Sequence, residues 1–76
     1  MNTSPNSPSP LKAKLSAREL ELLTWLNKGH CFKRAAVAMI VEETTVKTLA
    51  SRAYKKLGVH NLQAALYVAR NQNLID

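Results

Sequence analysis

Cysteine, metal-binding side chains and aromatic rings are scarce in this sequence, and each shortage excludes a class of protein. Cys31 is the only cysteine, so the chain cannot close an intramolecular disulfide. No apolar segment of the kind that a secretory signal needs stands at the N-terminus. The mean hydropathy of -0.20 leaves too little apolar sequence for a membrane span. We therefore expect a protein of the reducing cytoplasm that does not bind membranes.

Candidate metal ligands and catalytic groups are few. His30, Cys31 and His60 do not form the paired spacing of zinc sites. Cys31 and His30 are adjacent, so their side chains should diverge rather than form a catalytic dyad. A chain of 76 residues also allows only one small domain, which excludes a large enzyme. We predict a protein that is not an enzyme and has no metal and no cofactor.

Positive charge, by contrast, is in excess. Eleven Lys and Arg against five Asp and Glu give a formal net charge of +6, which favours nucleic acid as a partner. Aromatic residues make up only 5% of the chain, whereas RNA-binding modules stack bases on clusters of exposed rings. Trp25 and Tyr54 are expected in the core or at its edge. Double-stranded DNA is therefore the preferred partner.

Composition divides the chain near Leu15. Residues 1–14 hold all three prolines, several Ser and Asn, and no periodic apolar pattern, which predicts a disordered tail. A plain solvated terminus is the favoured interpretation of this tail, and a phosphate-seeking arm carrying Lys12 and Lys14 is the alternative. Residues 15–76 are predicted to form the folded domain.

The first helix has a well-marked start. Ser16 and Glu19 have the spacing of a capping box, and Leu15 and Leu20 have the spacing of a hydrophobic staple. Together with the leucines that follow, these residues predict a helix over roughly residues 16–28.

A short second helix is predicted over residues 32–40. Lys33 and Arg34 stand at its beginning, where the helix dipole disfavours positive charge. An anion outside the protein is the favoured explanation of these two residues, and a plain solvated face is the alternative.

The third and longest helix is predicted between Val41 and Gly58, with acids at its start and lysines at its end, as the helix dipole favours. The residues expected to face the core recur at helical spacing: Val46, Ala50, Ala53 and Leu57. The residues on the opposite side are small, polar or positive: Thr44, Lys47, Thr48, Ser51 and Lys55.

A fourth helix is predicted over residues 62–72, with Asn61 as its cap and Asn73 at a position where left-handed residues are common. It carries two apolar stripes, and one core can bury only one of them. The first stripe is Leu62, Ala65, Leu66 and Ala69. The second stripe, with a polar neighbour, is the predicted interface with another chain: Ala64, Tyr67, Val68 and Asn71. Four helices without a convincing strand predict an all-α fold.

The second and third helices are separated by only about three residues, which matches a helix-turn-helix. The third would then be the recognition helix, in which Lys47 donates to guanine while Thr48 and Ser51 offer hydroxyls. The predicted base-reading residues are Lys47, Thr48, Ser51 and Thr44. No acidic residue occurs from Thr44 through Ile75 to repel phosphates. The cations placed to neutralise the DNA backbone are Arg52, Lys55 and Lys56.

These motifs together resemble the LuxR/GerE-type helix-turn-helix domain of quorum-sensing and two-component regulators. The resemblance runs from Leu15 to about Ile75. The matching residues are L-S-A-R-E with L-L two residues later, Gly29, Lys33, Ala36, the T-V-K-T run at Thr45 to Thr48, the K-K-L-G-V run at Lys55 to Val59, and Asn61.

The resemblance implies a four-helix domain whose third helix enters the major groove and whose fourth helix pairs with a second copy, so that a dimer reads an inverted repeat. It implies base-reading roles for Lys47, Thr48 and Ser51. It also implies that Lys33, Thr45 and Lys56 contact the DNA backbone. The length resembles that of small stand-alone members without a sensor domain, from bacteria or their phages and plasmids.

Four positions depart from the family pattern. Ile40 stands where the turn often has Gly, and because a β-branched residue resists positive φ, we expect an altered or strained turn. Glu42 replaces the usual Ser cap. Leu49 and Leu62 replace a common His and a common Arg. Either the core is packed differently around these leucines, or they add apolar surface for a partner.

Two functions are compatible with this pattern. The favoured one is a sequence-specific DNA-binding transcriptional regulator that acts as a dimer and contacts RNA polymerase or other regulators. The alternative is an interaction protein that pairs through its fourth helix with a full-length LuxR-type regulator and modulates it. The joint presence of Lys47, Thr48 and Ser51 favours DNA binding, since a pure decoy need not keep them.

Overall fold

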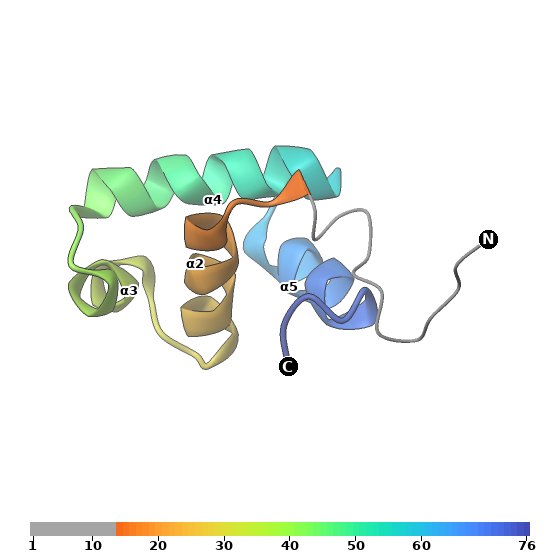
Figure 1. The fold of residues 1–76 in the computed structure, drawn as a ribbon, viewed down its shortest axis with the longest axis horizontal. Helices are drawn as coiled ribbons and strands as arrows, with labels where there is room; N and C mark the ends of the chain where they lie inside the picture. The colour runs from red at the N-terminus through yellow and green to blue at the C-terminus, as the bar shows by residue number, and fades with distance from the viewer. Residues whose placement is uncertain (1–13) are drawn as a thin grey trace.

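The computed structural model describes residues 14–76. From residue 16 onward this part of the chain forms four helices and no strand, labelled as in Figure 1: α2 (Ala17–Asn27), α3 (Phe32–Met39), α4 (Glu43–Leu57) and α5 (Leu62–Asn71). The predicted all-α fold is confirmed, and each helix occupies the segment predicted for it. The tail predicted over residues 1–14 lies, except for Lys14, outside the described residues.

Helix α2 begins with the predicted capping box. The Ser16 Oγ accepts a hydrogen bond from the Glu19 amide at 3.1 Å, and the Glu19 carboxylate accepts one from the Ser16 amide at 2.9 Å. Leu15 is buried just before this cap, and Leu20 packs partly against the core, as the staple requires. Local side chains thus fix where α2 starts.

The ends of the later helices also follow their predicted signals. Asn61 caps α5 by accepting from the Ala64 amide at 2.8 Å, whereas Glu42 makes no side-chain cap on α4. Gly58 ends α4 with φ 75°, and Asn73 follows α5 with φ 58°. These left-handed residues turn the chain sharply after each helix.

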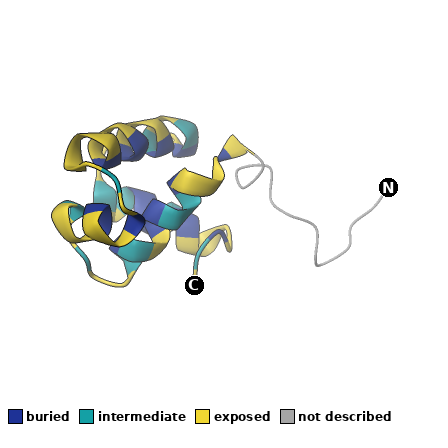
Figure 2. Cartoon of the chain, turned by 60° about the vertical axis from the view of Figure 1, so that its left-hand side comes forward, coloured by how far each residue is buried: buried dark blue, intermediate teal, exposed yellow. Residues whose placement is uncertain are grey.

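Helix α4 lies across the other three helices (Figure 1). Below it, α2 stands between α3 and α5 and contacts all three of the others. One side of α4 therefore packs on the domain, and the opposite side faces solvent (Figure 2).

The core forms between α4 and the helices beneath it. Leu22, Leu23 and Val46 are among its most fully buried side chains, and its many alanines let the helices approach closely. Leu49 is buried in this cluster, whereas Leu62 is only partly buried against it. Because Leu49 is buried, it does not add apolar surface for a partner, which was the second of the two alternatives. The buried stripe predicted for α4 is confirmed: Val46, Ala50, Ala53 and Leu57.

The turn between α3 and α4 keeps a left-handed residue even though that residue is isoleucine. Ile40 has φ 58° and ψ 50°, and its side chain is 90% exposed. The Val41 amide donates to the Ala36 carbonyl at 3.0 Å, which closes the turn as in a Schellman motif. Of the two predicted outcomes, an altered or a strained turn, the structure therefore shows the strained one.

We expect Ile40→Gly to stabilise the protein. Glycine adopts positive φ without steric cost, so relief of the strain outweighs its larger entropy loss and leaves a net gain of about 1 kcal/mol. The free energy of unfolding from urea titration measures this gain. Ile40→Ala is the control, because it removes the exposed apolar surface but keeps the Cβ, and it should gain less. Equal effects of the two substitutions would contradict backbone strain.

Candidate nucleic-acid interface

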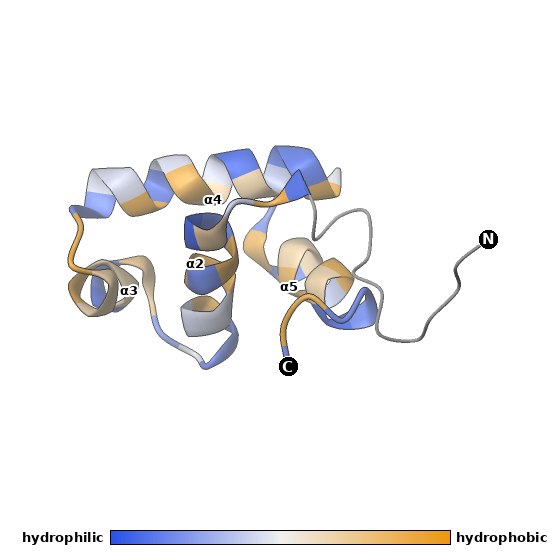
Figure 3. Cartoon of the chain, in the orientation of Figure 1, coloured by the Kyte–Doolittle hydropathy of each residue, from blue (hydrophilic) through white to orange (hydrophobic). Residues whose placement is uncertain are grey.

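The outward side of α4 is a continuous polar strip. Figure 3 shows apolar residues on the side of α4 that faces the domain and more polar ones on the outer side. The predicted base-reading residues Thr44, Lys47, Thr48 and Ser51 are all exposed there. Because they follow helical spacing over two turns, they share one face that could enter a groove. We refer to these four residues as the α4 strip.

Side chains of the α4 strip interact only weakly with the rest of the protein. The Lys47 ammonium lies 3.9 Å from a Glu43 carboxylate oxygen one turn away, in an exposed ion pair. Such pairs contribute little in water, so Lys47 can exchange Glu43 for another acceptor. The Thr48 hydroxyl donates to the Thr44 carbonyl at 3.1 Å, which leaves the hydroxyl oxygen free to accept.

Most residues predicted to contact phosphates surround this strip as exposed side chains. Lys33 stands at the start of α3, and Thr45, Arg52 and Lys55 lie on α4. All four are exposed. These exposed side chains therefore come from two helices that pack against each other, α3 and α4.

Lys56 differs from those residues because it is held by another helix. Its ammonium lies 2.8 Å from the Glu19 carboxylate at the start of α2, and the Glu19 residue is only 2% exposed. Burial raises the pKa of Glu19, but the hydrogen bond and charge of Lys56 and the bonds from Ser16 outweigh it, so the net pKa lies below the ordinary 4.5. Lys56 thus ties the end of α4 to α2. A phosphate contact by Lys56 remains a prediction.

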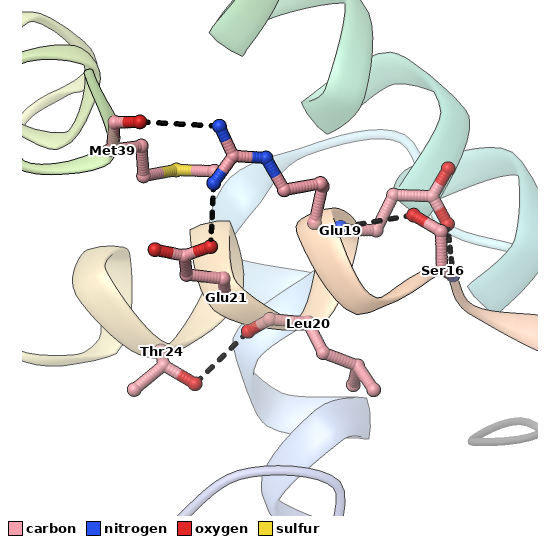
Figure 4. Close-up of polar contacts among 7 residues, drawn as sticks. Ser16, Glu19, Leu20, Glu21, Thr24 and Met39 are labelled. Carbon is pink, nitrogen blue, oxygen red and sulfur yellow. Dashed lines mark hydrogen bonds and ion pairs between the residues drawn. The ribbon is translucent and has the colours of Figure 1, made fainter. Parts of the chain in front are cut away.

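Sequence reasoning missed this ion pair and a second contact of α2. The sequence pattern links Glu19 only to Ser16 of the capping box, whereas its ion-pair partner Lys56 is 37 residues away. Arg18, its neighbour, donates to the Met39 carbonyl at the end of α3 at 3.1 Å and to Glu21 at 2.8 Å (Figure 4). The only signal in the sequence is that both residues belong to the L-S-A-R-E motif.

Helix α5 buries most of its first predicted stripe, whereas in the second stripe Tyr67 and Asn71 are exposed and Val68 packs partly against the core. Ala65, Leu66 and Ala69 are buried, whereas Tyr67 is 66% exposed. Its neighbours on the same side are partly or fully exposed: Ala64, Val68 and Asn71. This outer stripe is the surface predicted to contact a second chain.

The candidate residues that remain, an aromatic ring, a histidine and a cysteine, lie in or next to the loop between α2 and α3. The Trp25 ring lies 5.3 Å from the His30 ring and 5.0 Å from the Lys28 ammonium. Trp25 and Tyr54 pack at the edge of the core, as predicted. Cys31 is an exposed free thiol. Within residues 14–76, no three His, Cys, Asp or Glu side chains are grouped to hold a metal, and no helix is long and apolar enough to cross a membrane.

Comparison with known proteins identifies similar sequences and folds. Residues 13–69 match the family described as bacterial regulatory proteins, luxR family. The chain is 40% identical over 68 residues to the probable transcriptional regulatory protein NarL of Mycobacterium tuberculosis, covering 90% of this chain and 32% of that protein. It is 34% identical over 70 residues to the transcriptional activator protein ExpR of Dickeya dadantii, covering 92% of this chain and 28% of that one.

A solved structure shares the fold. The crystal structure of the response regulator ChrA, from a heme-sensing two-component system, superposes with a TM-score of 0.78 at 46% identity, covering 80% of this chain and 30% of that chain. The chain thus spans about a third or less of the length of each of these proteins.

Proposed function

The chain belongs to the luxR family of bacterial regulatory proteins, a family of DNA-binding regulators rather than enzymes, and from this membership we propose that it reads specific sites in double-stranded DNA with α4 in the major groove. The α4 strip carries the proposal, because its four side chains are exposed, contain no carboxylate and point away from the core. Lys47 donates to guanine O6 or N7, and Thr44, Thr48 and Ser51 offer hydroxyls to neighbouring bases.

In the proposed complex, the surrounding cations fix the position of α4 and the strip selects the sequence. Lys33, Arg52 and Lys55 neutralise phosphates, and Thr45 donates its hydroxyl to the backbone. Lys56 keeps its bond to Glu19 and contributes to phosphate binding only through its remaining ammonium protons.

We further propose that two copies pair through the outer stripe of α5. An exposed Tyr67 beside Ala64 and Val68 supplies an apolar centre, and Asn71 supplies a polar edge. Two-fold pairing would present two α4 helices to an inverted repeat. Bound at such a site, the protein would change transcription by contact with RNA polymerase or with another regulator.

Selection of bound sequences from a random DNA pool, followed by affinity measurements over a salt series, tests DNA reading. We expect a selected inverted repeat and a steep loss of affinity with salt. Lys33, Arg52 and Lys55 amount to about six phosphate contacts in a dimer, which corresponds to a slope of log K against log salt of about −5. A pool that shows no preferred sequence, or an affinity independent of salt, would contradict the proposal.

Tyr67→Glu is expected to abolish pairing, because two carboxylates would be buried against each other in the interface. Sedimentation should show a monomer, and affinity for the inverted repeat should fall at least tenfold while affinity for a single half-site stays. Gln72→Glu, an exposed change of equal charge outside the outer stripe, is the control. If both variants sediment like the unaltered protein, α5 is not the interface. Pairing only with a full-length regulator would support the interaction-protein alternative.

A further inference from the structure

The end of α3 is completed by a side chain from another helix. The last carbonyls of a helix lack partners within it. In α3, the Ala36 and Val37 carbonyls accept from the amides of Val41 and Ile40 at 3.0 and 3.2 Å. The Met39 carbonyl accepts instead from Nη2 of Arg18 on α2, at 3.1 Å. Arg18 therefore supplies a donor that the turn itself does not provide.

The charge of Arg18 also suits this position. Helix α3 has no basic residue in its last turn, so the guanidinium is the cation that its negative end would otherwise lack. Glu21, one turn further along α2, accepts a hydrogen bond from the other guanidinium nitrogen at 2.8 Å (Figure 4). This exposed ion pair favours the orientation in which Arg18 reaches Met39, although the bond to the Met39 carbonyl is the contact that joins the two helices.

The Met39 carbonyl belongs to the peptide plane that directly precedes Ile40. The φ angle of Ile40 describes rotation about the bond between this peptide plane and the Ile40 Cα. At 58°, it is a conformation that isoleucine disfavours. A bond that anchors the plane resists relaxation of Ile40 toward negative φ. Because α4 begins only three residues later, at Glu43, any such relaxation would redirect the start of α4.

Two neighbouring residues of α2 thus hold α4 at both ends. Arg18 acts on its start through the α3–α4 turn, and Glu19 binds Lys56 in its last turn at 2.8 Å. Resting on the DNA-binding function proposed above, we infer that Arg18 is a positioning residue for sequence reading. It fixes the angle at which the α4 strip meets the bases and makes no contact with DNA itself.

Loss of this bond should affect base contacts more than phosphate contacts. Hydrogen bonds to base edges need the start of α4 in one orientation, whereas phosphate attraction tolerates small rotations. The measured quantity is the specificity ratio, defined as the affinity for the selected DNA site divided by that for a random duplex. Arg18→Met should lower this ratio about tenfold and change random-duplex affinity less than about threefold.

Lys28→Met is the matched control, since it removes one exposed cation from the other end of α2 and should leave the ratio unchanged. Arg18→Lys keeps the charge but lacks the fork that joins Met39 to Glu21, so it should give an intermediate ratio. Equal losses of specific and random binding in Arg18→Met, corrected for the folded fraction, would overturn the inference. Failure of the unaltered protein to prefer any sequence would instead overturn the proposed function.

Hydrogen exchange tests the turn without DNA. In Arg18→Met, the Val41 amide, which bonds the Ala36 carbonyl, should exchange at least tenfold faster. The Val59 amide, bonded to the Tyr54 carbonyl at 2.9 Å beyond the other end of α4, should be unaffected. Unchanged exchange at Val41, or equal acceleration at both amides, would overturn the positioning role whatever the DNA measurements show.

Discussion

Lys56→Met is expected to destabilise the protein by about 2 kcal/mol at neutral pH, because it leaves the buried Glu19 carboxylate without its cation. Loss of one partner from a fully buried pair costs more than this, but the Lys56 side chain is 35% exposed, so part of the pair's energy is already screened by water. The Ser16 amide still donates to the Glu19 carboxylate and limits the loss further. Urea unfolding of both proteins measures the difference.

The pH dependence of stability should weaken in this variant. In the unaltered protein the folded pKa of Glu19 lies below the unfolded value of 4.5. Its contribution to stability is therefore complete above that value and is lost as pH falls through the folded pKa. Without Lys56, its hydrogen bond and charge no longer lower the pKa of Glu19, so this pKa should rise toward 4.5 and Lys56→Met should lose less stability than the unaltered protein as pH falls.

A second substitution isolates the unpaired charge. Adding Glu19→Gln to Lys56→Met removes the carboxylate while keeping a side chain that can accept the Ser16 bond. The double variant should recover much of the lost stability and should show little dependence on pH below neutral. If the double variant is less stable than Lys56→Met by the full cost of Glu19→Gln alone, the two residues are not coupled in solution.

Lys47→Ala is expected to weaken binding to the selected DNA site by about 1–3 kcal/mol, or roughly 10- to 100-fold, and to relax preference at one position per half-site. The reason is that Lys47 lies in the middle of the α4 strip and is held only by an exposed carboxylate 3.9 Å away. Titration of the selected site and of single-base variants of that site measures both effects.

Comparison with random DNA separates base reading from simple charge loss. A lysine that contacts only phosphate would weaken all sequences about equally and reduce the salt slope by about 1 for each copy. Lys28→Ala is the control for total charge, because it removes an exposed cation just after the end of α2. If Lys47→Ala reduces the affinity for the selected site and for random DNA by the same factor, Lys47 does not read bases.

The sequence by itself determined the helices, the core-facing side of α4 and the family. Helix ends depend on residues only a few positions apart, such as Ser16 with Glu19 and Asn61 with Ala64, so their signals can be read directly. The side of α4 left for a partner follows from helical spacing in the same way. A β-branched Ile40 in the turn likewise pointed to altered or strained backbone.

Only the tertiary structure decided what holds α4 in place. The bonds of Arg18 to Met39 and of Lys56 to Glu19 join residues 21 and 37 positions apart, and no local pattern pairs such distant side chains. Packing also decided that Leu49 enters the core, although it lies outside the stripe predicted to be buried. The physical reason is that periodicity shows which residues share a face, whereas the neighbouring helices decide whether that face is covered.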